Sequence, residues 1–193
     1  SMYVILCLIC FGFCFFDSGN LIYSYIASAM VGALTVFLHY NMFGSIEKRT
    51  KTFMGDSGSM MLGFSLAYLS IKYICDEDNG SFDVQERMLL CMSLLFVPFI
   101  DLFRVVLERL FHGDRLFAAD KRHIQYKLMS AGIYGRLTLL CVLAMVLVII
   151  LINLLLTLCS WEISYIFIAD VSLYVVFMHI LNRRIVQYRS TMA

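Results

Sequence analysis

Six apolar segments, five of them long enough to cross a lipid bilayer, most strongly limit what this chain can fold into. They occupy residues 2–16, 21–40, 57–75, 88–107, 137–157 and 162–181. A membrane-spanning helix needs about 20 mostly apolar residues, and 61% of the 193 residues are hydrophobic while 15% are charged. Since the bilayer core offers no partners to backbone N–H and C=O groups, spanning segments of this kind form helices. We therefore predict an all-α, polytopic transmembrane helix bundle with about six spans.

The positive charges predict how this bundle is oriented. Of the 15 lysines and arginines, 13 fall in alternate loops and the C-terminal tail, whereas the intervening loops are short or acidic. Basic loops lie preferentially in the cytoplasm, so both termini and the loops 41–56 and 107–136 are predicted to be cytoplasmic. A net charge of +1 argues against a nucleic-acid partner. The basic residues are Lys48, Arg49, Lys51, Arg104, Arg109, Arg115, Lys121, Arg122, Lys127, Arg136, Arg183, Arg184 and Arg189.

No repeat, low-complexity tract or linker interrupts the chain, so we predict a single helical domain over residues 1–193. Seven cysteines, an odd number scattered mostly through apolar segments, do not form a disulfide pattern. The one proline, Pro98, is expected to kink the fourth span at Val97–Ile100 and to direct Asp101 and Arg104 toward a shared interior.

A carboxylate flanked by glycines, Gly55-Asp56-Ser57-Gly58, stands where a basic loop meets an apolar segment. Small neighbours leave room for a metal ion and phosphate oxygens to reach Asp56. The alternative is structural, because Asp and Ser are favoured helix N-caps. Both interpretations are open at this point.

Charged residues inside a span cost free energy and therefore need a partner or a function. Asp101 and Arg104 are three residues apart on one helix face and can pair with each other. Alternatively, Arg104 binds a phosphate near the membrane surface while Asp101 orients it. For Asp170 and His179, an interhelical hydrogen-bonding role is the favoured interpretation.

The predicted cytoplasmic loop after the fourth span contains Asp120-Lys121-Arg122-His123 and then Tyr126 and Lys127. A solvated positive-inside loop explains the lysines and arginines. It does not explain His123 and Tyr126, which can hydrogen-bond or stack. Cationic donors of this kind also stabilise the charge that develops in phosphoryl transfer.

Four motifs in this order resemble the polyprenyl-phosphate N-acetylhexosamine-1-phosphate transferases, an undecaprenyl-phosphate GlcNAc-1-phosphate transferase-like group within glycosyl transferase family 4. The motifs are Phe37-Leu38-His39-Tyr40-Asn41; Thr52-Phe53-Met54-Gly55-Asp56-Ser57-Gly58-Ser59-Met60-Met61-Leu62-Gly63-Phe64; Val97-Pro98-Phe99-Ile100-Asp101-Leu102-Phe103-Arg104-Val105; and Phe117-Ala118-Ala119-Asp120-Lys121-Arg122-His123.

The resemblance implies transfer of a sugar-1-phosphate from a UDP-sugar to undecaprenyl phosphate, with release of UMP, for cell-envelope polysaccharide such as lipopolysaccharide or cell-wall polymer. It implies Mg²⁺, with Mn²⁺ as an alternative, bound by Asp56, and it makes Asp56 and His123 the expected catalytic residues. It also implies a bacterial inner membrane location, with the active site facing the cytoplasm. The expected substrate-binding residues are Asn41, Ser57, Gly58, Asp101, Arg104, Asp120, Lys121, Arg122 and Tyr126.

Two departures from the family pattern leave other functions open. Gln125 and Tyr126 stand where a His-X-His-His motif has two further histidines, and neither titrates as imidazole does near neutral pH. Members of the family usually have ten or eleven spans and an Asp-Asp pair in their first half, so we expect this chain to be a C-terminal half that needs that half or a second subunit. The alternatives are a truncated or degenerate, non-catalytic protein that binds lipid phosphate or a partner, and a small transporter or channel subunit.

Overall fold

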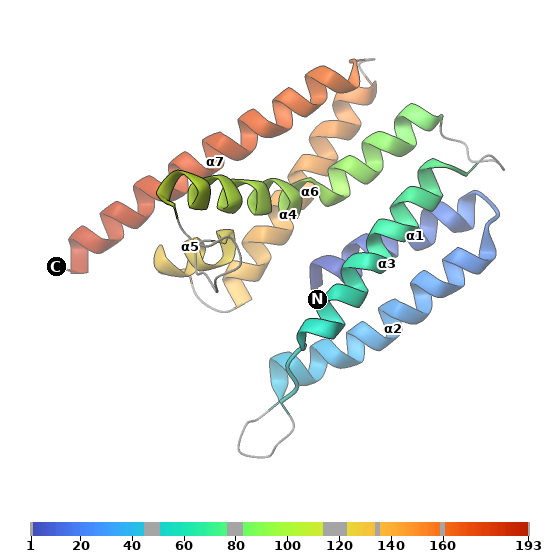
Figure 1. Cartoon of the computed structure of the whole chain (residues 1–193), viewed down its shortest axis with the longest axis horizontal. Coiled ribbons are helices and arrows are strands. Elements are labelled where there is room, and N and C mark those ends of the chain that lie inside the picture. The colour runs from blue at the N-terminus through green and yellow to red at the C-terminus, as the bar shows by residue number, and fades with distance from the viewer. Residues whose placement is uncertain are drawn as a thin grey trace. The chain divides into compact units, whose positions relative to one another are not determined.

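The computed structural model describes residues 2–44, 51–76, 83–113, 123–133, 136–158 and 161–192. All regular secondary structure in these residues is helical (Figure 1), which confirms the predicted all-α class. The helices are α1 (Met2–Asp17), α2 (Leu21–Phe43), α3 (Asp56–Ile74), α4 (Val84–His112), α5 (Ile124–Ser130), α6 (Arg136–Leu158) and α7 (Ile163–Met192).

Four of the described helices are long and apolar enough to cross a membrane, in agreement with a transmembrane bundle. They cover Leu21–Phe43, Val84–Phe111, Leu137–Thr157 and Ile163–Gln187. Helix α1 is apolar but has 16 residues, and α3 has 19 residues that include four serines and Lys72. The count of about six spans and the cytoplasmic location of both termini stay predictions.

Helix α2 shows that the large apolar side chains face outward. Its buried residues are Ser24, Ala27 and Leu34, whereas Ile22 is 72% exposed. Only 17% of its most apolar 18-residue window is buried. A water-soluble protein rarely exposes such a continuous apolar surface, and in a membrane these side chains contact lipid.

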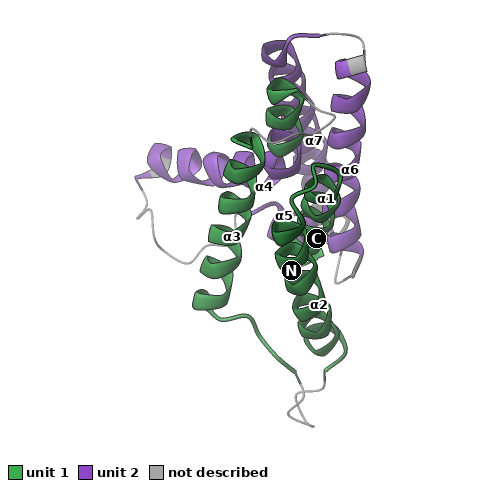
Figure 2. Cartoon of the chain, turned by 90° about the vertical axis from the view of Figure 1, so that its right-hand side faces the viewer, with its two compact units in different colours: residues 1–91 green, residues 92–193 purple. Residues whose placement is uncertain are grey.

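The chain divides into two compact units, Ser1–Cys91 and Met92–Ala193 (Figure 2). The boundary falls within α4, so no linker or change of composition marks it in the sequence.

The first unit is built around α1, which packs against α2 and α3. Phe11 and Phe15 of α1 are fully buried, and both rings meet the ring of Tyr73 edge-on, with centroids 6.3 and 5.6 Å away. At Gly12 a Cβ atom would lie 3.8 Å from the Cβ of Ala27 in α2, which is an ordinary van der Waals contact. Aromatic edge-to-face pairs of this kind add about 0.5–1.5 kcal/mol beyond their burial.

A polar cluster ties together one end of this unit. Asp76 is buried and accepts hydrogen bonds from Asn20 in the α1–α2 turn and from Lys72 of α3, whose Nζ lies 3.3 Å away. Arg87 of α4 donates to the backbone carbonyl of Asp76. Gly19, with φ at 77°, makes the tight turn that brings Asn20 there, because L side chains rarely adopt a positive φ.

In the second unit, α4 continues as a helix through Pro98 and changes direction along its length (Figure 1). Proline has no N–H to donate and its ring displaces the preceding turn, which is the physical cause of a bend. The helix ends before Gly113, where φ is 70°. Leu94 and Phe96 are buried, and the Phe96 ring packs edge-on against Phe167 of α7 at 6.0 Å.

A buried polar group, which we call the polar pin, joins three helices of this unit. Asn153 of α6 donates through Nδ2 to Ser93 Oγ of α4 at 2.7 Å and to Asp170 Oδ2 of α7 at 2.9 Å. All three residues are at most 5% exposed. The predicted interhelical role of Asp170 is confirmed, whereas His179 is exposed and makes no such bond to a described residue.

The short helix α5 lies within the segment predicted only as a cytoplasmic loop. It packs on α6 and α7, with Ile124 and Leu128 buried while Gln125 and Tyr126 point outward. Two buried side chains four residues apart form one apolar face, which is what holds so short a helix in place.

Candidate functional site

Asp56 is the first residue of α3 and its carboxylate is exposed. The N-cap of the helix is Gly55 in an extended conformation, and no side chain donates or accepts a capping hydrogen bond there. The alternative that Asp56 or Ser57 caps the helix is therefore wrong. A carboxylate in the first turn still interacts favourably with the helix dipole, and no described residue forms an ion pair with it.

The segment that leads to Asp56 is attached to the end of α2. Asn41 donates through Nδ2 to the backbone carbonyl of Thr52 at 2.8 Å, so the predicted binding residue Asn41 closes the loop before Asp56. Ser57 is exposed beside it, and Gly58 lies close to the side chain of Met54, whose Cγ would be 3.3 Å from a Cβ atom at position 58. The space around Gly55 is open.

Asp56 is suited to bind a divalent cation, but it would supply only one of the ligands that such an ion needs. Among the described residues, no three His, Cys, Asp or Glu side chains gather closely enough to hold a metal ion. Mg²⁺ is commonly held by only one or two carboxylates together with substrate phosphates and water. An exposed carboxylate that forms no ion pair with the described residues fits the role of one such ligand.

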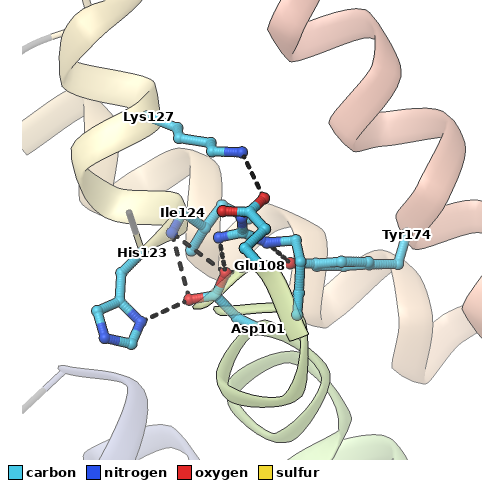
Figure 3. A network of polar contacts seen from close by, with 7 residues as sticks. Asp101, Glu108, His123, Ile124, Lys127 and Tyr174 are labelled. Atoms are coloured by element: carbon cyan, nitrogen blue, oxygen red, sulfur yellow. Dashed lines mark hydrogen bonds and ion pairs between the residues drawn. The ribbon is translucent and has the colours of Figure 1, made fainter. Parts of the chain in front are cut away.

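Asp101 of α4 is the hub of a polar network in the second unit (Figure 3). Asp101 is buried, with 5% of the residue exposed. It accepts from Arg104 Nη2 at 2.7 Å, from Tyr174 Oη at 3.1 Å and from the backbone N–H of Ile124 at 3.2 Å. Its second oxygen lies 3.0 Å from Nδ1 of His123. A buried carboxylate with this many donors is fully satisfied.

The same network engages Arg104 and Lys127. Arg104 Nη1 donates to Glu108 at 2.6 Å and its Nε donates to Tyr174 at 3.2 Å. Lys127 Nζ donates to Glu108 at 3.2 Å. The intrahelical pairing of Arg104 with Asp101 is therefore present, and the two carboxylates balance the two cations. The phosphate-binding role of Arg104 stays a prediction.

His123 immediately precedes α5 and lies at the edge of the network. Its side chain is 44% exposed, while the carboxylate beside its Nδ1 is buried. Tyr126 is exposed one helical turn later. The predicted site residues Asp120, Lys121 and Arg122 lie outside the described residues, as do the two basic residues Lys48 and Arg49 in the loop before α3.

Two members of this network, Glu108 and Tyr174, were not predicted from the sequence. Glu108 is four residues from Arg104 on α4, a spacing that places the two side chains on one helix face and was readable from the sequence. Tyr174 is 73 residues from Asp101 and comes from the apolar helix α7, so no local pattern indicated it. Asp56 belongs to the first unit and the Asp101 network to the second.

Comparison with known proteins agrees with these motifs. Residues 1–74 match the model of glycosyl transferase family 4. A decaprenyl-phosphate N-acetylglucosaminephosphotransferase of Mycobacterium tuberculosis is 34% identical over 113 residues, which cover 55% of this chain and 27% of that protein. Undecaprenyl-phosphate alpha-N-acetylglucosaminyl 1-phosphate transferases of Salmonella typhi and Escherichia coli are 28% and 27% identical over 108 residues, which cover 56% of this chain and 28% of each relative.

No solved structure matches the chain. The matched region is 27–28% of the length of these curated relatives. The pairwise matches extend over 113 and 108 residues and so reach beyond the 74 residues matched by the family model. The chain is therefore similar to glycosyl transferase family 4 over residues 1–74, and to the named phosphotransferases over about half of its length.

Proposed function

We propose that this chain is part of an enzyme that transfers N-acetylhexosamine-1-phosphate from a UDP-sugar to undecaprenyl phosphate, at the cytoplasmic face of a bacterial inner membrane. The observation that carries this proposal is the match to curated relatives named for transfer of N-acetylglucosamine phosphate to a polyprenyl phosphate. The predicted cytoplasmic position of Asp56 and His123 supports it, because nucleotide sugars are cytoplasmic. The product would feed cell-envelope polysaccharide assembly.

In the proposed reaction one diphosphate linkage replaces another: the phosphorus that bears the sugar is transferred from UMP to the lipid phosphate. An oxygen of the lipid phosphate forms a bond to the phosphorus that bears the sugar. The bond from that phosphorus to the bridging oxygen of UMP breaks, and UMP leaves with that oxygen. No net oxidation or hydrolysis occurs, so the site must position two phosphates and compensate their charge.

Asp56 is the residue that would hold Mg²⁺ in this reaction, and the ion would neutralise charge on the diphosphate. The exposed carboxylate at the start of α3 offers its oxygens without having to break an ion pair with a described residue. His123 would accept the proton of the attacking phosphate when that phosphate is a monoanion. Gln125 and Tyr126, both exposed, would offer hydrogen bonds to the sugar or phosphate.

The test is UMP release by the full-length protein in lipid nanodiscs supplied with UDP-GlcNAc, undecaprenyl phosphate and MgCl₂. We expect Asp56→Asn to abolish turnover, because an amide is a much poorer Mg²⁺ ligand than a carboxylate. The matched control is Asp17→Asn, an exposed acid-to-amide change at the end of α1, which should leave turnover unchanged. Full turnover by Asp56→Asn would rule out the role of Asp56. Residues 1–193 alone are expected to show weak or no transfer.

A second candidate function is binding without catalysis. The exposed Gln125 and Tyr126, in place of two histidines of the family motif, favour it. It predicts that the full-length protein binds a UDP-sugar, measured by calorimetry, yet releases no UMP under any metal condition. Restoration of UMP release by Gln125→His with Tyr126→His would show that loss of these histidines is the cause.

A further inference from the structure

We infer that Asp101 is a positioning residue that fixes the orientation and tautomer of His123, so that Nε2 is the nitrogen presented to the substrate. The inference rests on the proposed function, because it assigns which atom of His123 acts there. It also changes the role of Asp101 from the orienting partner of Arg104 alone to the shared support of Arg104 and His123.

Hydrogen-bond chemistry decides the tautomer. An ionised carboxylate only accepts hydrogen bonds, and Asp101 Oδ2 lies 3.0 Å from His123 Nδ1. The nitrogen that faces it must therefore carry the hydrogen. In the neutral imidazole this leaves the lone pair on Nε2, which is the tautomer that free histidine in water favours less. A carboxylate partner selects histidine tautomers in the same way in metal sites and hydrolases.

The carboxylate is itself held from several sides. Arg104 comes from the same helix and Tyr174 from α7, and both donate to Oδ1 at 2.7 and 3.1 Å. Figure 3 shows Tyr174 and His123 on opposite sides of the Asp101 carboxylate. Because Asp101 is buried and its donors are in place, its oxygens cannot follow a moving imidazole.

The backbone fixes the position from which the ring extends. The N–H of Ile124, the residue after His123, lies 3.2 Å from each oxygen of the same carboxylate. One carboxylate therefore holds both the main chain and the side chain at the start of α5. A flip of the ring would place a carbon atom against Asp101 and lose the hydrogen bond, so one ring orientation is strongly preferred.

The remaining edge of the ring is open. The His123 side chain is 44% exposed, and its Nε2 makes no hydrogen bond to a described residue. In Figure 3 the ring extends away from the network, on the side opposite Tyr174. The Nε2 lone pair is thus available to take a proton from a phosphate monoanion, which leaves the phosphate dianion and an imidazolium stabilised by Asp101.

Asp101→Asn tests this inference by replacing the carboxylate with an amide of the same shape. The amide oxygen can still accept from Ile124 N–H, but the amide nitrogen would donate to His123 Nδ1 and force the hydrogen onto Nε2. The tautomer is read from ¹⁵N NMR of histidine-labelled full-length protein in nanodiscs at a pH where imidazole is neutral. The signal is assigned with His123→Gln, because the chain has four histidines.

We expect His123 in the unsubstituted protein to carry its hydrogen on Nδ1 and in Asp101→Asn to carry it on Nε2. UMP release should fall about 10–100-fold in Asp101→Asn, the usual effect of removing such a support. Tyr174→Phe is the companion variant. It removes one donor to Asp101 but keeps the carboxylate, so the Nδ1–H tautomer should persist.

The outcomes separate the two proposals. Hydrogen on Nε2 in the unsubstituted protein, or an unchanged tautomer in Asp101→Asn, would overturn the positioning role whether or not UMP is released. The expected change of tautomer with no UMP release by any variant would uphold the positioning role and refute the transferase proposal. The Nδ1–H tautomer of the unsubstituted protein is the result that a purely structural role of Asp101 in docking α5 would not give, because an imidazole without a carboxylate partner favours hydrogen on Nε2.

Discussion

The polar pin gives the sharpest test of how the second unit is held together. The perturbation is Asn153→Ala, which removes both Nδ2 hydrogen bonds, at 2.7 Å to Ser93 and at 2.9 Å to Asp170. Asp170 then loses the donor that its buried carboxylate has in this structure. Since the three residues come from α4, α6 and α7, the change acts on the packing of three helices at once.

The expected loss of unfolding free energy follows from the two hydrogen bonds that are removed and from the Asp170 carboxylate that is left without this donor. Interhelical hydrogen bonds inside membranes contribute about 0.6 kcal/mol on average and at most about 1.7. A buried acceptor left without its donor costs about 1–3 kcal/mol. We therefore expect Asn153→Ala to lower the free energy of unfolding by about 2–4 kcal/mol. In a double-mutant cycle with Asp170→Ala the coupling energy should be about 1–2 kcal/mol.

The assay is unfolding by SDS in mixed micelles, followed by the fluorescence of Trp161. This is the only tryptophan, and its ring packs edge-on against Tyr165 of α7 at 6.1 Å, so its emission reports on that end of the unit. The control is Ser172→Ala on α7, whose hydroxyl is exposed and bonds within its own helix to Ala169. It should change stability by less than about 0.5 kcal/mol.

Additive losses of unfolding free energy in the two single variants would refute this reasoning. If the Asn153→Ala and Asp170→Ala losses sum to that of the double variant within about 0.3–0.5 kcal/mol, the two side chains do not stabilise each other. Burying these polar groups would then cost free energy, and the apolar packing around them would offset that cost.

Two further predictions concern stability alone. Gly12→Ala should raise the unfolding free energy of the full chain by about 0.5–1 kcal/mol, because its Cβ would make an ordinary 3.8 Å contact with Ala27. Gly12→Leu should lower it by overpacking, and a loss with Gly12→Ala would contradict the α1–α2 packing. Lys127→Met should cost less than about 1 kcal/mol, because its ion pair with Glu108 is partly exposed and Glu108 keeps its bond to Arg104. A loss well above that in the SDS titration would mean that Lys127 supports the network more than its exposure suggests.

The helix boundaries show how well the local sequence predicts where each helix begins and ends. The apolar segment 137–157 became α6 (Arg136–Leu158), and 2–16 became α1 (Met2–Asp17). The segment 88–107, in contrast, lies within the longer α4 (Val84–His112). The bilayer limits how many residues must be apolar, but a helix continues in polar residues until its backbone is interrupted, as it is at Gly113 with φ at 70°.

The candidate site was predictable only in part. The pairing of Asp101 with Arg104 follows from three-residue spacing on one helix. The contact of Asp101 with His123, 22 residues away, depends on how α5 docks. Nothing in the local sequence indicates this contact, since α5 is short and its polar residues look like those of a solvated loop. The metal-binding role of Asp56 stays a prediction, and only the structure showed that its side chain does not cap α3.

By itself the sequence determined that this chain is an all-α membrane protein and that its motifs resemble those of glycosyl transferase family 4. Both are properties of contiguous residues, because transfer into lipid depends on the composition of about 20 neighbours and a motif is read along the chain. Only the tertiary structure decided which polar groups meet inside the helices. Tyr174, Asn153 and Asp170 reach their partners because of the rotation of each helix about its own axis, which side-chain packing sets and which the order of residues does not reveal.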